Sequence, residues 1–168
     1  IAAKAQGWAG GAAGYNAGTI NNSYSISDVS VTGYDDGVNP VNNYADFYIA
    51  GLVGHNDGSI NNAYAMGDIW IDTTTIFSAG NLGGLAATGG GSTNQAFYST
   101  DTTGQSGGQG NGTDTNSLMV DPGNFGWDNA SIWGGIASTT LPYLRWQVPD
   151  GTTPQAVSGF AFSALDGG

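Results

Sequence analysis

The chain has 168 residues, of which 30 are glycine and 9% are charged. Two basic residues, Lys4 and Arg145, stand against thirteen acidic residues, all of them aspartate, so the net charge is −11. Because neutralising phosphate takes many lysines and arginines, this balance argues strongly against a nucleic-acid-binding protein and against contact with anionic membranes. The absence of cysteine excludes disulfides and thiolate metal sites, and no run approaches the roughly 20 apolar residues of a membrane-spanning helix.

The composition also indicates the fold class. Hydrophobic residues make up 39% of the chain, which is enough to build a core. Glutamate is absent and lysine occurs once, so strong helix formers are scarce. Asparagine, serine, threonine and glycine, which favour tight turns, fill the remaining positions. We therefore expect an all-β protein of short strands.

Three segments of the chain repeat one pattern without gaps. They are GAAGYNAGTINNSYSISDV from Gly11, GLVGHNDGSINNAYAMGDI from Gly51 and GLAATGGGSTNQAFYSTDT from Gly84. The second copy starts 40 residues after the first, and the third starts 33 residues after the second. The first two copies share Gly14/Gly54, Asn16/Asn56, Gly18/Gly58, Ile20/Ile60, Asn21/Asn61, Asn22/Asn62, Tyr24/Tyr64 and Asp28/Asp68. The third copy keeps fewer of these residues.

Each copy reads as about three short strands joined by tight turns. In the second copy, residues 50–53 form an apolar run, a turn follows at 56–58, and residues 69–72 alternate so that Ile69 and Ile71 share one face. Residues 29–32 are the equivalent strand of the first copy. The pattern therefore predicts strands at matching places in successive copies.

Stacking of the copies explains why the pattern repeats. A unit this small cannot bury its apolar face alone, whereas stacked copies bury a continuous one. Parallel stacking would place Ile20 on Ile60, Tyr24 on Tyr64, and Asn21 or Asn22 on its equivalent. We expect a parallel β-solenoid. An antiparallel sandwich or meander is the alternative, but it gives no reason to repeat the same residues.

The second copy resembles the GLUG motif of bacterial surface and secreted proteins. The residues that fit are Gly51, Leu52, Val53, Gly54, Asn56, Gly58, Ile60, Asn62, Tyr64, Ala65 and Gly67. Position 63 departs from the motif, with alanine in place of serine. The first copy departs further, with alanines at 12 and 13 and Ser27 in place of glycine.

The resemblance continues after the third copy. Proteins with this motif often end their repeats in a segment like the one seen here, with Phe97–Thr100, Thr103–Gln105, Met119–Pro122, Phe125, Gly126–Asp128, Trp133 and Leu141–Trp146. The similarity covers residues 11–146 in the family's own order.

The resemblance implies a part of a large filamentous-haemagglutinin-like adhesin exported by two-partner secretion. Such proteins look like long right-handed parallel β-helices at the bacterial cell surface, and the motif has no agreed catalytic role. We therefore expect a non-enzymatic, secreted structural or adhesive module without a cofactor. Its expected partners are a glycan or protein of a host cell or other surface and the neighbouring domains of the same polypeptide. Nucleic acid and membrane insertion are not expected.

The expected organisation has three parts. Residues 1–106 form the stacked coils, and residues 107–148 form a closing segment in which Trp127, Trp133, Tyr143 and Trp146 cover the last core. Residues 149–168 read as a linker followed by the first strand of a further β domain.

The candidates for catalysis are few. His55 is the single histidine, so a Ser-His-Asp triad would have to use it, but its repeat equivalents are Tyr15 and Thr88 and we expect it to face solvent. Polysaccharide lyases and hydrolases also occur on parallel β-helices. A hydrolase needs a pair of carboxylates, and lyases usually hold acidic sugars with basic groups, which here are Lys4 and Arg145 alone. We expect no enzymatic activity.

The sequence contains two candidate binding sites. Asp35, Asp36 and Asn39 cluster oxygen ligands that calcium accepts, although a solvated loop is the simpler interpretation. Trp70, which alternates with Ile69 and Ile71, is expected to face outward and to contact a glycan, with Tyr48 and Trp8 as weaker candidates. A carbohydrate-binding module and a self-assembling extracellular fibre subunit are therefore the alternatives to a purely structural module.

Overall fold

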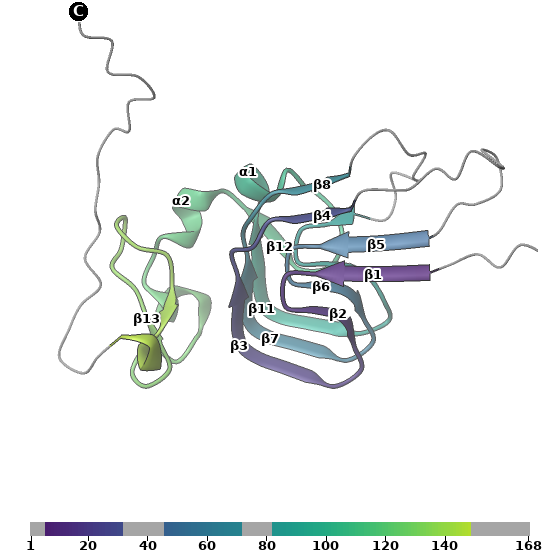
Figure 1. Ribbon diagram of the computed structural model, residues 1–168. Helices are drawn as coiled ribbons and strands as arrows, with labels where there is room; N and C mark the ends of the chain where they lie inside the picture. The colour runs from purple at the N-terminus through teal and green to yellow at the C-terminus, as the bar shows by residue number, and fades with distance from the viewer. Residues whose placement is uncertain (1–5, 32–45, 72–81, 149–168) are drawn as a thin grey trace, which may run out of the picture.

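The computed structural model describes residues 6–31, 46–71 and 82–148. Within these residues the chain consists mostly of β-strands in parallel sheets, with a few short helices (Figure 1). The predicted all-β class is therefore confirmed. None of the helices in these ranges is long and apolar enough to cross a membrane.

The three copies of the sequence pattern form equivalent strands. The first copy and the strand before it contain β1 (Gln6–Gly10), β2 (Ala13–Asn16), β3 (Thr19–Ser25) and β4 (Val29–Val31). The second contains β5 (Asp46–Ala50), β6 (Val53–Asn56), β7 (Ser59–Ala65) and β8 (Ile69–Ile71). The third contains β9 (Leu82–Gly83), β10 (Ala86–Thr88) and β11 (Ser92–Ser99).

Equivalent strands of successive copies pair in parallel. The sheets run in the orders β1-β5-β9, β10-β6-β2, β12-β11-β7-β3 and β4-β8. Ile20 pairs with Ile60 and Tyr24 with Tyr64, an offset of 40 residues, while Ser92 pairs with Ser59 at an offset of 33 residues. The predicted register is therefore confirmed in both steps.

The cores lie between the sheets and are richest in the second copy. One cluster contains Leu52, Val53, Ile60, Ala63 and Ala65 together with residues of the third copy, and all five are fully buried. A second cluster joins the sheet of β4 and β8 to that of β1, β5 and β9. Its buried members are Val29, Ile49 and Ile69.

Residues 107–113 fold back over the third copy and cover its core. After helix α1 (Thr100–Thr103), the carbonyl oxygen of Gly107 accepts a hydrogen bond from the N–H of Gly84 at 3.0 Å. Strand β12 (Asn111–Thr113) then pairs in parallel with β11. A Cβ at position 110 would lie 2.8 Å from the side chain of Leu85, so the return packs tightly on the last core.

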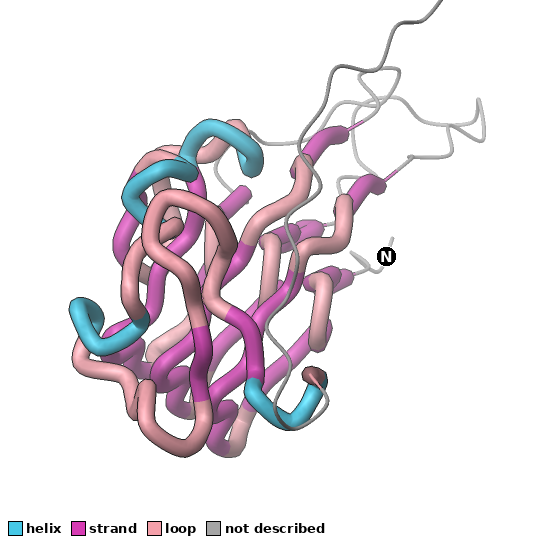
Figure 2. The backbone as a smooth tube through the Cα atoms, turned by 90° about the vertical axis from the view of Figure 1, so that its left-hand side faces the viewer, coloured by secondary structure: helices cyan, strands magenta, loops and turns pink. Residues whose placement is uncertain are grey.

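The remaining segment is compact and lies beside the stack. It contains α2 (Thr115–Leu118), the 3-10 helix η2 (Pro122–Phe125), the antiparallel pair β13 (Trp133–Gly134) and β14 (Tyr143–Leu144), and the 3-10 helix η3 (Arg145–Gln147). Figure 1 shows it beside β3, and in the turned view of Figure 2 it lies across the strands.

This placement differs from the expected one for the tryptophans. Trp127 and Trp133 pack on Tyr64, and Tyr24 and Phe97 border the same cluster, so these rings cover the outer face of the β3-β7-β11 sheet. Residues 107–113 cover the last core instead. Trp146 is 79% exposed and covers neither surface. Residues 149–168, the predicted linker and further strand, lie outside the described part of the chain.

Candidate binding site

Close approach of two sheets sets the geometry of the site. The connection between β1 and β2 consists of Gly11 and Ala12, and it turns the chain back on itself. A Cβ at Gly14 would lie 2.6 Å from the carbonyl oxygen of Trp8, and one at Gly54 would lie 2.6 Å from the N–H nitrogen of Ala9. The two repeated glycines therefore let β2 and β6 pack directly against β1 and β5.

This close packing gathers four rings, which we call the aromatic platform: Trp8, Tyr15, Tyr48 and His55. Trp8 pairs with Tyr48 across β1 and β5, and Tyr15 pairs with His55 across β2 and β6. The ring centroids of Trp8 lie 5.5 Å from those of Tyr15 and 5.6 Å from those of His55, and Tyr15 stacks on His55 at 5.4 Å. Tyr48 meets His55 edge-on at 6.3 Å.

The platform faces solvent through two of its members. Trp8 is 40% exposed and Tyr15 is 47% exposed. Tyr48 and His55 are half-buried beside them. Large aromatic rings held in contact with one another at a surface are candidates for ligand contact.

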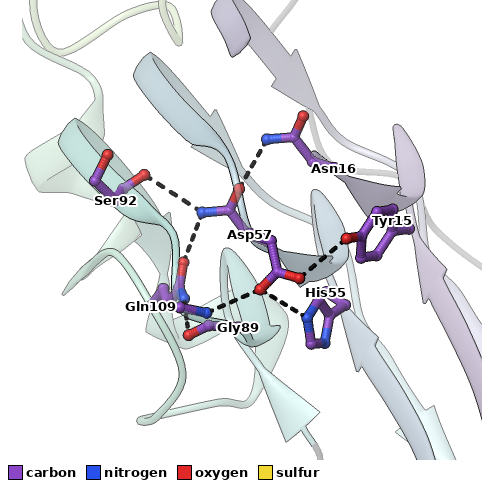
Figure 3. A network of polar contacts seen from close by, with 9 residues as sticks. Tyr15, Asn16, His55, Asp57, Gly89, Ser92 and Gln109 are labelled. Carbon is purple, nitrogen blue, oxygen red and sulfur yellow. Dashed lines mark hydrogen bonds and ion pairs between the residues drawn. The ribbon is translucent and has the colours of Figure 1, made fainter. Parts of the chain in front are cut away.

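Asp57 lies at the edge of the platform and binds three donors (Figure 3). Its Oδ2 accepts from the hydroxyl of Tyr15 at 3.0 Å, and its Oδ1 lies 3.0 Å from Nε2 of His55 and accepts from the N–H of Gly90 at 3.1 Å. The Gly90 N–H, then the Tyr15 hydroxyl and His55, hold the pKa of Asp57 below its usual value. The same carboxylate raises the pKa of Tyr15.

A ladder of amides lies near Asp57 (Figure 3). The buried Asn16 donates from Nδ2 to Oδ1 of Asn56 at 2.7 Å, and Asn56 donates to Oε1 of Gln109 at 2.8 Å. A further ladder runs along the long strands, where Asn61 donates to Asn21 at 2.9 Å. These bonds connect successive copies, and the predicted asparagine stacking is confirmed.

His55 does not have the partners of a catalytic base. Its Nε2 faces Asp57, and no hydrogen-bond partner lies near its buried Nδ1 among the described residues. A triad requires a nucleophile on the opposite side of the imidazole from the carboxylate. The pair of His55 and Asp57 therefore lacks a reacting group in this part of the chain.

The other predicted site residues are dispersed. Trp70 is 46% exposed, as expected, but it lies on β8 opposite Ser30, and no ring among the described residues packs on it. Asp35, Asp36 and Asn39 lie outside the described residues. In the described ranges, no group of three or more histidine or acidic side chains is arranged to hold a metal. Arg145 donates to the carbonyl oxygens of Asn129 and Trp133, which is a structural role.

Comparison with known proteins does not extend these observations. The chain matches no model of a protein family, no curated protein and no solved structure. The case for a function therefore depends on the residues and contacts described above.

Trp8 and Tyr48, two members of the platform, were candidate ligand-binding residues from the sequence, whereas Tyr15 and Asp57 were not. Alignment of the copies does place Tyr15 over His55, which was a usable signal. Tyr15 and His55 contact Trp8 because β2 packs against β1. The spacing of the repeat does not predict this contact between different strands of one copy.

Proposed function

We propose that the chain is a non-enzymatic structural and adhesive module of a large secreted or cell-surface protein, built as coils of a right-handed parallel β-helix. The resemblance of residues 51–67 to the GLUG motif supports this proposal. The composition supports it as well, because a chain with many aspartates and few basic residues stays soluble without attracting nucleic acid. In such a protein the module would hold a binding surface away from the cell.

One observation carries the proposal. The same residue types lie on one another in the first two copies, at an offset of 40 residues: Ile20 on Ile60, Tyr24 on Tyr64 and Asn16 on Asn56. The strands of each copy pair with those of the next copy, so units can be added to the stack without changing its cross-section. A spacer needs this property, whereas a closed globular core does not have it.

Insertion of repeat units tests the proposal. Residues 51–83 span the interval from the second copy to the third, and variants with one to four extra copies of this segment are prepared. Each inserted unit adds one layer to the stack, so the maximum dimension in small-angle X-ray scattering grows by about 4.8 Å per unit. The far-UV circular dichroism per residue remains that of parallel β-structure.

A scrambled insertion is the control for this experiment. Scrambling the sequence of the inserted unit keeps its length and composition, and this variant is expected to gain a flexible loop and no regular increment. If the native insertion behaves like the scrambled one, the coils do not extend as a solenoid and the spacer function is wrong.

A further inference from the structure

The aromatic platform has an electrostatic character that defines its ligand. The faces of aromatic rings are electronegative, and Asp57 is a carboxylate, which is ionised near neutral pH. Its side chain is 43% exposed at the edge of the platform. The whole chain has a net charge of −11. This combination attracts cations and repels acidic sugars, phosphates and nucleic acids.

The hydrogen bonds at the platform narrow the class of cation. A carboxylate offers about four lone pairs, and Asp57 already accepts from Tyr15, Gly90 and His55. The Tyr15 hydroxyl and His55 Nε2 use their donors on the same carboxylate. An ammonium or guanidinium group donates several hydrogen bonds, and Asp57 has about one lone pair left to accept them. A quaternary ammonium group donates none.

We propose that the aromatic platform binds a quaternary ammonium group, of which choline is the simplest example. Trp8 and Tyr15 supply the ring faces, and Asp57 supplies the negative charge. The half-buried Tyr48 and His55 hold these two rings in place. The proposal concerns a ligand site, and it stands whether or not the chain serves as a spacer.

The geometry of the rings fits this ligand. A cation–π contact requires the cation within about 6 Å of a ring centroid. The centroids of Trp8 and Tyr15 lie 5.5 Å apart and their planes are inclined by 44°. One trimethylammonium group above the junction can therefore contact both rings, and its methyl groups cover apolar surface that is otherwise exposed.

Titration with choline chloride, followed by isothermal calorimetry and by tryptophan and tyrosine NMR signals, tests the proposal. Sodium chloride is adjusted to keep the ionic strength constant. The neutral analogue 3,3-dimethylbutan-1-ol has the same shape without the charge, and we expect it to bind at least fivefold more weakly than choline. Equal binding of the two compounds would overturn the proposal.

Variants assign the binding to the platform. Trp8→Ala and Tyr15→Ala should each weaken choline binding roughly two- to fivefold, as expected for one cation–π contact at an exposed site. Asp57→Asn removes the charge and should also weaken choline binding. Circular dichroism confirms that each variant is folded.

Trp70→Ala is the matched control, because Trp70 is exposed to a similar degree and lies outside the platform. Binding that falls as much in this variant as in Trp8→Ala would contradict the assignment. Neutral oligosaccharides form a second series, and a chain that binds them but not choline would be a carbohydrate-binding module instead.

The quaternary ammonium group could come from a free small molecule or from a lipid headgroup, and a comparison of two ligands distinguishes these sources. Free choline is compared with vesicles of phosphatidylcholine, which present the trimethylammonium group next to a phosphate. Binding of choline alone assigns a soluble ligand, and binding of both assigns a headgroup; each result supports the proposal. Absence of binding in both arms contradicts it.

Discussion

Three residues in the long strands adopt a left-handed backbone at the same place in every copy. Their φ angles are 49° at Asn22, 51° at Asn62 and 47° at Gln95. In a regular strand, residues two apart share a face, yet Ile60, Ala63 and Ala65 all lie in the inner core while Tyr64 packs outside. The left-handed residue shifts the alternation by one position, as a bulge does.

This role predicts the effect of two substitutions at one position. Asn62→Val places a β-branched side chain in the left-handed region, which should lower the free energy of unfolding by about 1–3 kcal/mol. Asn62→Gly accepts the same φ and should cost less, although both variants lose the 3.4 Å hydrogen bond to Asn22. Urea unfolding measures both. Equal destabilisation would show that the hydrogen bond matters and the backbone does not.

At the scale of elements, the β3-β7-β11 sheet has two covered faces. Its inner face contributes to the main core, and its outer face meets the tryptophan-rich segment. Polar contacts fix this second layer: Tyr64 donates to the carbonyl oxygen of Pro142 at 2.7 Å, and Nε1 of Trp127 donates to that of Gln95 at 2.9 Å. Burial also raises the pKa of Tyr64. The segment is thus a second layer on the sheet.

The importance of this layer is tested by two tryptophans of the same segment. Trp133 is fully buried, so Trp133→Ala should destabilise the protein by about 3–5 kcal/mol. Trp146 is 79% exposed, and Trp146→Ala should change stability by less than about 0.5 kcal/mol. Thermal and guanidinium unfolding provide the comparison. A small loss at both positions would mean that the segment contributes little to the folded state.

At the scale of the whole molecule, the tryptophan-rich segment contacts all three copies. Tyr24, Tyr64 and Phe97 come from successive strands and all belong to, or pack against, the cluster that contains Trp127 and Trp133. Stacked repeats otherwise interact with nearest neighbours alone and unfold in parts. A layer that touches every copy should couple them.

We therefore expect one cooperative unfolding transition. Tryptophan fluorescence, which includes the signals of Trp127 and Trp133 in the outer layer, and far-UV circular dichroism, which reports on the strands, should give the same midpoint in urea. Trp133→Ala weakens the coupling, so the two midpoints should separate in that variant. Separate midpoints in the native chain would contradict the coupling.

The first copy, which forms the edge of the described sheets, shows a further feature at this scale. Ala12 and Ala13 occupy the places of Leu52 and Val53, and Ser23 and Ser25 those of Ala63 and Ala65. The strands β1, β2 and β3 are edges of their sheets. Smaller and more polar side chains reduce the apolar surface where no described strand covers the core.

Repetition made much of the fold predictable. The all-β class, the parallel pairing, both offsets and the ladders of Ile20 and Tyr24 followed from the aligned copies, because like residues at equivalent positions fit one another when stacked. Trp8 and Tyr48 were identified as candidates of the site by their size and chemistry. Trp70 was expected to be exposed, and it is.

The sequence by itself determined which residues of one copy pair with which residues of the next, because the spacing of the repeat sets that register. The tertiary structure alone decided which different strands and segments pack against one another within and beside the stack. Tyr15 and Asp57 join Trp8 because Gly14 and Gly54 allow two sheets to touch, and the tryptophans cover the flank because left-handed asparagines turn the Tyr24 ladder outward. Both are contacts between non-equivalent segments, on which the repeat carries no information.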